Sequence, residues 1–254
     1  MSVTELIRLV PLFMVSFGAG IIDLSLGMGF GFTVTPIMLL LGFTPAEAVP
    51  SVLFSSFIGG ISSSYFNHRF HNVDFRAGSK ELKIALFTGG LGMIGAIAGV
   101  LISLNLPARI VGLYIGLLVI ASGVIVIYSK AFITSFSWPR MLVISLVGSL
   151  NKGLTGSGFG PVITTGAILS GISEKASVSI QAFAEAAVAF VGFVTYVLLR
   201  SNYDAEVLAA MSLGVVVASP FAALIMSRLK GDSMRLMVGA LAVVIGVSTL
   251  LKYL

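Results

Sequence analysis

Three ionisable side chains interrupt long apolar stretches of this sequence. Lys152 follows Asn151 at the end of one stretch, Asp23 lies near the end of another, and Glu185 lies four residues after Gln181 within a third. A charge at the centre of a bilayer costs about 2.5–3.5 kcal/mol on insertion scales, so such a residue has a partner or a function. The ammonium of Lys152 suits the binding of an anion, and the carboxylate of Glu185 suits the carriage of a proton.

Each of these residues also has a structural interpretation. Lys152 either contacts an anionic ligand or pairs with Asp23, unless one or both charges reach the membrane surface and are hydrated. Glu185 either carries a proton that is coupled to the movement of another solute, or is a neutral side chain that fixes helix packing. Gln181 lies on the same helix face as Glu185. The sequence leaves these alternatives open.

A segment rich in glycine occurs twice in the chain. Residues 27–54 align without a gap with residues 156–183 at a constant offset of 129, which puts Lys152 at the position of Asp23. In a membrane chain, paired breaks in two halves are the best sequence indication of a transport site. Nine of the 28 aligned pairs are identical, namely Gly27/Gly156, Gly29/Gly158, Phe30/Phe159, Gly31/Gly160, Thr35/Thr164, Leu40/Leu169, Gly42/Gly171, Val49/Val178 and Phe54/Phe183.

Each copy of this repeat predicts a helical hairpin with its tip inside the membrane. The short apolar segment 33–43 is about 16 Å of helix, or about half of the hydrocarbon core, so it cannot cross alone. Pro161 fits the first turn of the second short helix, whose free amides and dipole favour an anion. Close helix packing through glycine is the alternative. The candidate tip residues are Gly29, Gly31, Thr33, Thr35, Ser157, Gly158, Gly160 and Thr164, with Thr155 and Thr165 nearby.

The composition predicts an integral membrane protein. Hydrophobic residues make up 57% of the 254 residues, charged residues make up 10%, and the mean hydropathy is +1.09. Apolar segments of membrane-spanning length follow one another along the chain. The net charge is +5, but the 15 Lys and Arg residues are scattered in short loops, which argues against a nucleic-acid partner. Cysteine is absent, which excludes disulfides and thiolate metal sites.

Ten apolar segments divide into two sets of five, one in residues 1–128 and one in residues 141–254. If each hairpin returns to the side that it entered, ten basic residues share one membrane face and four share the other. The positive-inside rule then makes the first face cytoplasmic and puts both termini outside. Full crossings would give a weaker split of nine against five. The ten are Arg69, Arg76, Lys80, Lys83, Lys130, Arg140, Lys175, Arg228, Lys230 and Arg235, and the four are Arg8, Arg109, Arg200 and Lys252.

The fold that follows is an all-α integral membrane protein made of two inverted repeats of about five helical segments each, with glycine-rich re-entrant or broken hairpins. An odd number of segments in each half reverses the second half in the membrane, so the repeats are related by a pseudo-two-fold axis in the membrane plane.

Other motifs give little support to an enzyme. The sequence lacks a Walker lysine motif, a nucleophile elbow and paired catalytic carboxylates, so we expect no catalytic residues and no cofactor. His68 and His71 lie in a polar loop with too few ligands for a metal site, and a solvated loop is the interpretation there. Serines between residues 51 and 64 could line a path, although helical serines often bond to their own backbone.

Several local patterns of the first repeat occur together. They are the glycine-rich stretch 27–31, Leu41-Gly42, Thr44-Pro45, the serines of residues 51–56 and Asn72-Val73-Asp74. In this order they resemble the first repeat of the sulfite exporter TauE/SafE family, and the second glycine-rich copy and the chain length extend the resemblance over nearly the whole chain. The resemblance implies a multi-pass plasma-membrane protein of bacteria or archaea that moves small sulfur-containing anions, such as sulfite, thiosulfate or organosulfonates, usually outward.

These inferences predict a secondary transporter of small sulfur-containing anions that works by alternating access at a site near the bilayer midplane. Its partners would be the small anion, the lipid bilayer and, if transport is coupled, a proton or another cation. An anion channel or a carboxylate transporter of the same fold is the alternative, and a membrane-bound scaffold is a third possibility.

Overall fold

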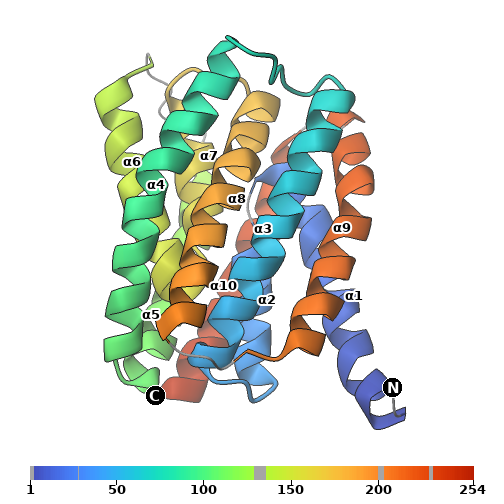
Figure 1. The fold of residues 1–254 in the computed structure, drawn as a ribbon, viewed down its shortest axis with the longest axis vertical. Helices are drawn as coiled ribbons and strands as arrows, with labels where there is room; N and C mark the ends of the chain where they lie inside the picture. Colours follow the sequence, from blue (N-terminus) through green and yellow to red (C-terminus); the bar gives the residue numbers. More distant parts are fainter. Residues whose placement is uncertain (1–2, 28, 129–135, 200–202, 229–230) are drawn as a thin grey trace.

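The computed structural model describes residues 3–27, 29–128, 136–199, 203–228 and 231–254. These residues form helices and no strand, which confirms the all-helical prediction (Figure 1). Lys130, Arg200 and Lys230, three of the basic residues counted above, lie outside them. The helices are α1 (Val3–Leu26), α2 (Phe30–Leu40), α3 (Pro45–Arg69), α4 (Lys80–Asn105), α5 (Ala108–Tyr128), α6 (Trp138–Thr155), α7 (Phe159–Leu169), α8 (Glu174–Leu199), α9 (Ala205–Arg228) and α10 (Gly231–Tyr253).

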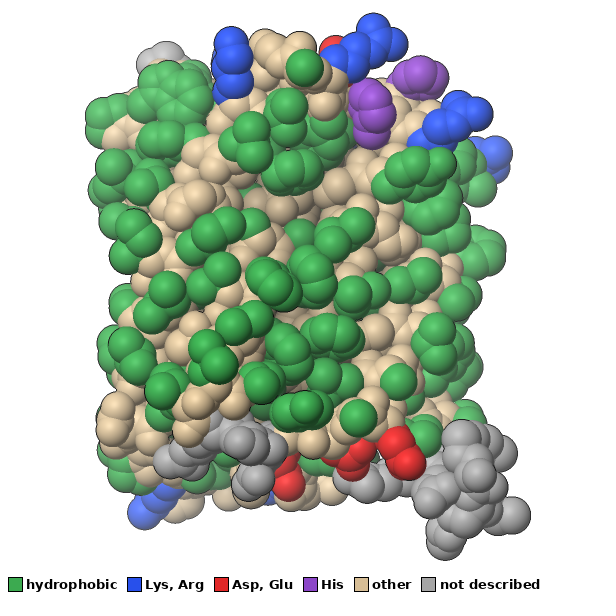
Figure 2. Space-filling view, viewed as in Figure 1, with side chains coloured by type: hydrophobic (Ala, Val, Ile, Leu, Met, Phe, Trp, Pro, Cys, Tyr) green, Lys and Arg blue, Asp and Glu red, His purple; other side chains and the backbone are tan. Residues whose placement is uncertain are grey.

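The surface of the bundle suits lipid. Figure 2 shows hydrophobic side chains over the middle of the visible face, with charged side chains at its two ends. Large apolar side chains such as Leu198 and Leu251 are 79% and 70% exposed, which water would disfavour. Five helical stretches among the described residues are long and apolar enough to cross a membrane, namely Leu9–Leu26, Lys80–Asn105, Ala108–Ile125, Glu174–Leu199 and Ala205–Arg228.

The two short helices α2 and α7 have matching bounds. Each has 11 residues, and their first and last residues correspond at the offset of 129. α2 begins three residues before the predicted start at residue 33. α7 begins at Phe159, so Pro161 is its third residue and still belongs to the first turn, where a backbone donor has no helical partner.

Both short helices also end in the same way. The amide of Phe43 donates to the carbonyl oxygen of Met38 at 3.0 Å, and the equivalent bond joins Ile172 to Ala167 at 3.1 Å. The intervening Gly42 and Gly171 have φ angles of 101° and 75°. This six-residue closure is the Schellman motif, which needs a left-handed residue after the helix and therefore favours glycine there.

The two halves of the chain pack through corresponding helices. α1 packs on α9, and α6 packs on α4. At the offset of 129, α6 is the equivalent of α1 and α4 is the equivalent of α9, so the two contacts are the same contact made once by each half. α3 packs on α8 and α5 packs on α10, so these contacts join equivalent helices. In Figure 1 the N and C termini lie at the same end of the bundle. Phe30 and Phe159, which begin α2 and α7, are 1% and 0% exposed and fix the two breaks in apolar clusters.

Candidate functional site

Two helix breaks bring backbone deep into the bundle. α1 ends at Leu26 and α2 begins at Phe30, while α6 ends at Thr155 and α7 begins at Phe159. The glycine after each first helix closes it, because the amide of Gly27 donates to the carbonyl of Asp23 at 2.6 Å and that of Gly156 to Lys152 at 2.8 Å. These glycines have φ angles of 72° and 71°, which glycine adopts without the penalty of a side chain.

The two breaks touch each other. The Thr164 hydroxyl of α7 donates to the carbonyl oxygen of Gly27 at 2.9 Å. On the other side, a Cβ atom on Gly31 would lie 2.3 Å from the carbonyl oxygen of Gly156 and 2.8 Å from the Cα of Ser157. Only glycine allows this approach of α2 to the second break, so the tips form one site and not two.

Lys152 is buried at this junction within the last turn of α6. Lys152 lies inside α6, which continues to Thr155 before Gly156 closes it. Lys152 is 1% exposed, its Nζ lies 2.5 Å from Oε1 of Glu185, and it donates to the hydroxyl of Ser56 at 2.8 Å. The Gln181 amide donates to the second carboxylate oxygen of Glu185. The pair therefore joins α6, α8 and α3.

Asp23 lies close enough to interact electrostatically with both Lys152 and Glu185. It is 5% exposed and lies near the backbone of Phe30, the first residue of α2. The direct partner of Lys152 is Glu185, and the described chain includes no ion pair between Lys152 and Asp23. All three charges are buried, so hydration at the membrane surface does not account for them.

Several polar groups around the breaks complete the site. Asn151 is 6% exposed, and its side-chain amide oxygen Oδ1 accepts a hydrogen bond from the Tyr114 hydroxyl of α5 at 2.5 Å. The hydroxyls of Thr35 and Ser157 are buried and have no hydrogen-bond partner in the described part of the chain. A buried hydroxyl without a partner is unfavourable, so these two groups mark places where a polar ligand would be stabilised.

The other predicted residues lie at the two breaks or on the helices beside them. Gly158 and Gly160 are buried at the start of α7, and Gly29 precedes α2 with a φ angle of 140°. Thr33 is half-buried on α2, whereas Thr155 donates to the carbonyl of Asn151 and closes the end of α6. The side chains of Pro161 and Thr165 lie outside the described side chains.

Two contacts of the site had no clear signal in the sequence. Tyr114 is one of three hydroxyl-bearing residues in the predicted apolar segment 110–128, and nothing local indicates that it reaches Asn151. Ser56 was one of several helical serines; Ser51 and Ser64 bond to their own backbone, as expected for such serines, while Ser56 accepts from Lys152. The distinction depends on which face of α3 meets α6 and α8.

The chain is similar to known proteins over most of its length. The chain is 27% identical over 245 residues to the protein named "Probable membrane transporter protein YtnM" of Bacillus subtilis (strain 168), an alignment that covers 91% of this chain and 79% of the relative. The model of the family described as sulfite exporter TauE/SafE matches residues 12–249, which include both breaks and all three buried charges. This multi-pass membrane protein therefore belongs to the sulfite exporter TauE/SafE family.

Proposed function

We propose that the protein is a secondary transporter that exports small sulfur-containing anions, such as sulfite or organosulfonates, across the plasma membrane by alternating access. One observation carries this proposal: the ammonium of Lys152 is buried 2.5 Å from the Glu185 carboxylate on a helix that ends at one of the two breaks, and the breaks also hold the unpartnered hydroxyls of Thr35 and Ser157. Hydroxyls, free helix amides and a buried ammonium are the donors that an oxyanion requires.

The packing supports two inverted repeats around this site. The contacts of α1 with α9 and of α6 with α4 are equivalent under the offset, as are those of α2 with α3 and of α7 with α8. Two repeats related by an axis between α3 and α8 would give this pattern. In such transporters one repeat or bundle moves against the other around a central site. The repeats proposed here are residues 1–128 and 141–254, and α2 and α7 are their re-entrant halves.

The charges at the site suggest how anion binding is coupled. Glu185 already neutralises Lys152, so an anion that binds Lys152 must compete with this carboxylate. A proton on Glu185 would remove the competitor and leave the ammonium for the anion. The charged groups that face Glu185 in the described structure are Lys152 on α6 and Asp23 on α1, so an ionised Asp23 would also oppose the anion. The proposal is therefore that proton uptake accompanies anion binding.

The choice of sulfur-containing anions rests on the family description, which names a sulfite exporter. The relative from Bacillus subtilis carries the name of a transporter without a substrate. The site geometry suits a small oxyanion and does not by itself separate sulfonates from carboxylates. Acetate therefore belongs in any substrate panel beside sulfite, thiosulfate and sulfoacetate.

Transport in proteoliposomes tests this function directly. Lys152→Met by itself leaves Glu185 buried without its partner, a defect that costs about 3–5 kcal/mol. The double variant Lys152→Met/Glu185→Gln has no unpaired member of this pair and is the better probe. We expect the wild type to show saturable uptake and counterflow of sulfite or sulfoacetate, and the double variant to lose both. Lys83→Met, at an exposed lysine in the first turn of α4, is the matched control and should transport normally.

The outcomes separate the alternatives. Transport that persists in a folded Lys152→Met/Glu185→Gln variant would exclude a role for the buried ammonium. Anion flux without saturation or counterflow would indicate a channel. Counterflow of acetate alone would indicate a carboxylate transporter of the same fold.

A further inference from the structure

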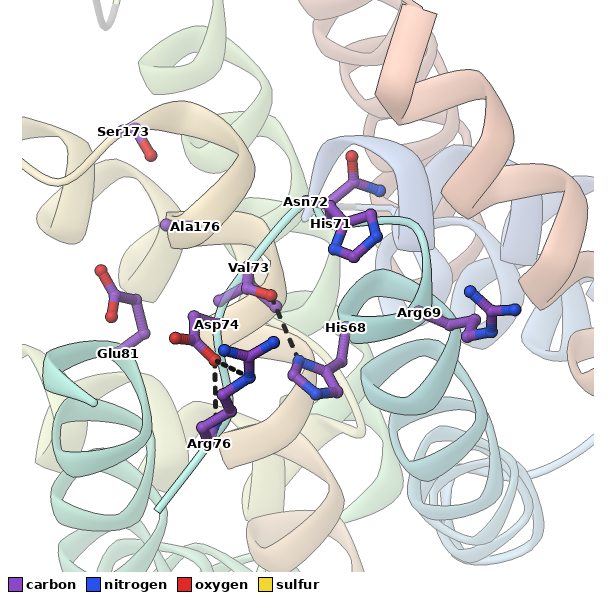
Figure 3. Close-up of a pocket in the computed structure, with 10 residues that line it drawn as sticks. All are labelled: His68, Arg69, His71, Asn72, Val73, Asp74, Arg76, Glu81, Ser173 and Ala176. Carbon is purple, nitrogen blue, oxygen red and sulfur yellow. Dashed lines mark hydrogen bonds and ion pairs between the residues drawn. The ribbon is translucent and has the colours of Figure 1, made fainter. Parts of the chain in front are cut away.

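A second group of basic side chains surrounds a cavity at one end of the bundle. The cavity has a volume of about 490 Å³ and lies where α3 ends, α4 begins and α8 begins. Figure 3 shows side chains from all three helices and from the loop 70–79 around it. Its lining residues include His68, Arg69, His71, Asn72, Asp74, Arg76, Glu81, Ser173 and Ala176.

The hydrogen bonds in the loop leave donors available in this cavity. Nδ1 of His68 lies 3.2 Å from the amide nitrogen of Phe75 and 3.4 Å from the carbonyl oxygen of Val73, so the loop engages this ring nitrogen in either tautomer. Asp74 is already engaged, because it accepts from the Arg76 amide at 2.9 Å and lies 3.9 Å from the Arg76 guanidinium. Arg69 makes no ion pair within the described chain, and Figure 3 shows Arg69 and Arg76 on either side of His68.

The start of α8 adds to the positive character of the cavity. α8 begins at Glu174, and its first helical hydrogen bond runs from the amide of Ser177 to the carbonyl of Ser173. The amides of Lys175 and Ala176 precede this bond and have no acceptor within the helix, and the dipole is positive at this end. Ser173 and Ala176 both line the cavity, so this helix end forms part of its wall.

Polar side chains connect the cavity with Lys152 along two helices that pack on each other. On α3, Asn72 of the loop donates to Asn67, and Asn67 donates to Ser63, both at 3.0 Å. Ser56 lies three helical turns from Asn67 on the same face, or about 16 Å along α3, and contacts Lys152. On α8, polar residues recur every four positions from the cavity to the ion pair, at Ser173, Ser177, Gln181 and Glu185.

We propose that this cavity is a second anion-binding site, at which a small oxyanion binds before it moves between α3 and α8 to Lys152. Two arginines, the imidazole of His68 and the start of α8 supply the recognition. The row of polar side chains between the cavity and Lys152 is closed to solvent in this structure, since Ser63, Asn67 and Ser177 are at most 1% exposed. The role of the cavity as a loading site rests on the proposed transport function, whereas anion binding in the cavity does not.

The histidines allow a direct test, because the chain has two and both line this cavity. NMR of protein labelled only in histidine therefore reports on this site. Titration of the full chain in nanodiscs with sulfate, and separately with sulfoacetate, should shift both histidine signals with saturation. Arg69→Gln/Arg76→Gln should weaken the apparent affinity at least about tenfold, the loss expected for one charge-assisted hydrogen bond. The matched control is Arg109→Gln. Arg109 is an exposed arginine at the start of α5 that donates to the backbone of Tyr253, and its replacement should leave the titration unchanged.

Two further results keep this proposal distinct from the proposed transport function. The histidine shifts should persist in Lys152→Met/Glu185→Gln, since the cavity does not include Lys152. In vesicles of known orientation, Arg69→Gln/Arg76→Gln should raise the half-saturating substrate concentration from the cavity side only, with an unchanged maximal rate. Absent shifts, or shifts of equal affinity in the arginine double variant, would overturn the second site even if transport by Lys152 is established. Equal effects from both sides would overturn its role in loading.

Discussion

A buried ammonium such as that of Lys152 is stable in an apolar interior only while its partners remain. Glu185 supplies the opposite charge and Ser56 supplies a hydrogen-bond acceptor. Gln181 holds the second oxygen of the carboxylate, so Glu185 is oriented toward Lys152 before any ligand arrives. The same contacts that stabilise the empty site therefore oppose an incoming anion, and in the proposed mechanism a proton on Glu185 removes this opposition.

Replacement of Glu185 by Gln tests this control at the level of one residue. A lower pH should strengthen thiosulfate binding in the wild type, because a proton on Glu185 leaves Lys152 for the anion. Glu185→Gln should show a weaker dependence on pH than the wild type, because its amide does not titrate. Thiosulfate is the suitable probe since its charge does not change in the neutral range, and Asp23→Asn should reveal any separate contribution of Asp23. The measurement is an isothermal titration between about pH 5.5 and 8, the range in which native proteins are most often stable. A wild-type affinity that does not depend on pH would contradict proton coupling.

At the scale of elements, the short helices matter because of where they stop. α2 and α7 each end in a Schellman motif, and each begins after a glycine that closes the preceding helix. Both ends are therefore specified locally, which fixes the depth of the two breaks. Their mutual contact then depends on Gly31, where any side chain would meet the backbone of the second break.

Gly31→Ala should separate the two breaks. Its Cβ would lie 2.3 Å from a backbone oxygen that cannot move without shifting α6 or α7, so we expect a loss of about 1–3 kcal/mol of stability and a large loss of transport. Gly90→Ala is the matched control, because Gly90 is an exposed residue of α4 and nothing lies within 4 Å of its Cβ position. It should be neutral or slightly stabilising, since alanine favours a helix more than glycine does. Thermal melting in detergent provides the measurement, and equal melting of Gly31→Ala and the wild type would show that the breaks are not in tight contact.

At the scale of the whole molecule, charge is distributed unequally between the two ends of the bundle. Figure 2 shows most of the visible basic and histidine side chains at one end and most of the visible acidic side chains at the other. Both chain termini lie at the end opposite the loop between α3 and α4 (Figure 1). The positive-inside rule thus assigns the end with the proposed second anion site to the cytoplasm, which is the side from which the proposed exporter would take its substrate.

Reporter tags test this orientation in cells. A tag at the carboxyl terminus should report a non-cytoplasmic location, and a tag inserted after Gly78 in the loop between α3 and α4 should report the cytoplasm. Gly78 is exposed and has open space around its Cβ position, so a tag that follows it would meet no neighbouring side chain there. A cytoplasmic carboxyl terminus would reverse the assignment and, with it, the proposed side of substrate loading.

Much of this architecture follows from the sequence because its signals are local. Apolar length identified the membrane class, the offset of 129 located both breaks, and the motifs around Leu41-Gly42 and Asn72-Val73-Asp74 indicated the family that the comparison confirms. The glycines with positive φ angles and the helix caps at Thr44 and Ser79 also depend only on residues close by in the sequence. Such features depend on contacts within a few positions of the chain.

The partners within the site depend on tertiary packing. Lys152 and Glu185 are 33 positions apart, Ser56 is 96 positions from Lys152, and Tyr114 is 37 positions from Asn151. Helical periodicity tells which residues share a face but not which face another helix will meet. The sequence therefore determined the membrane fold class and the two breaks, whereas the packing of α3, α6 and α8 decided that Glu185, and not the repeat-related Asp23, neutralises Lys152, because burial forces each charge to the nearest available partner.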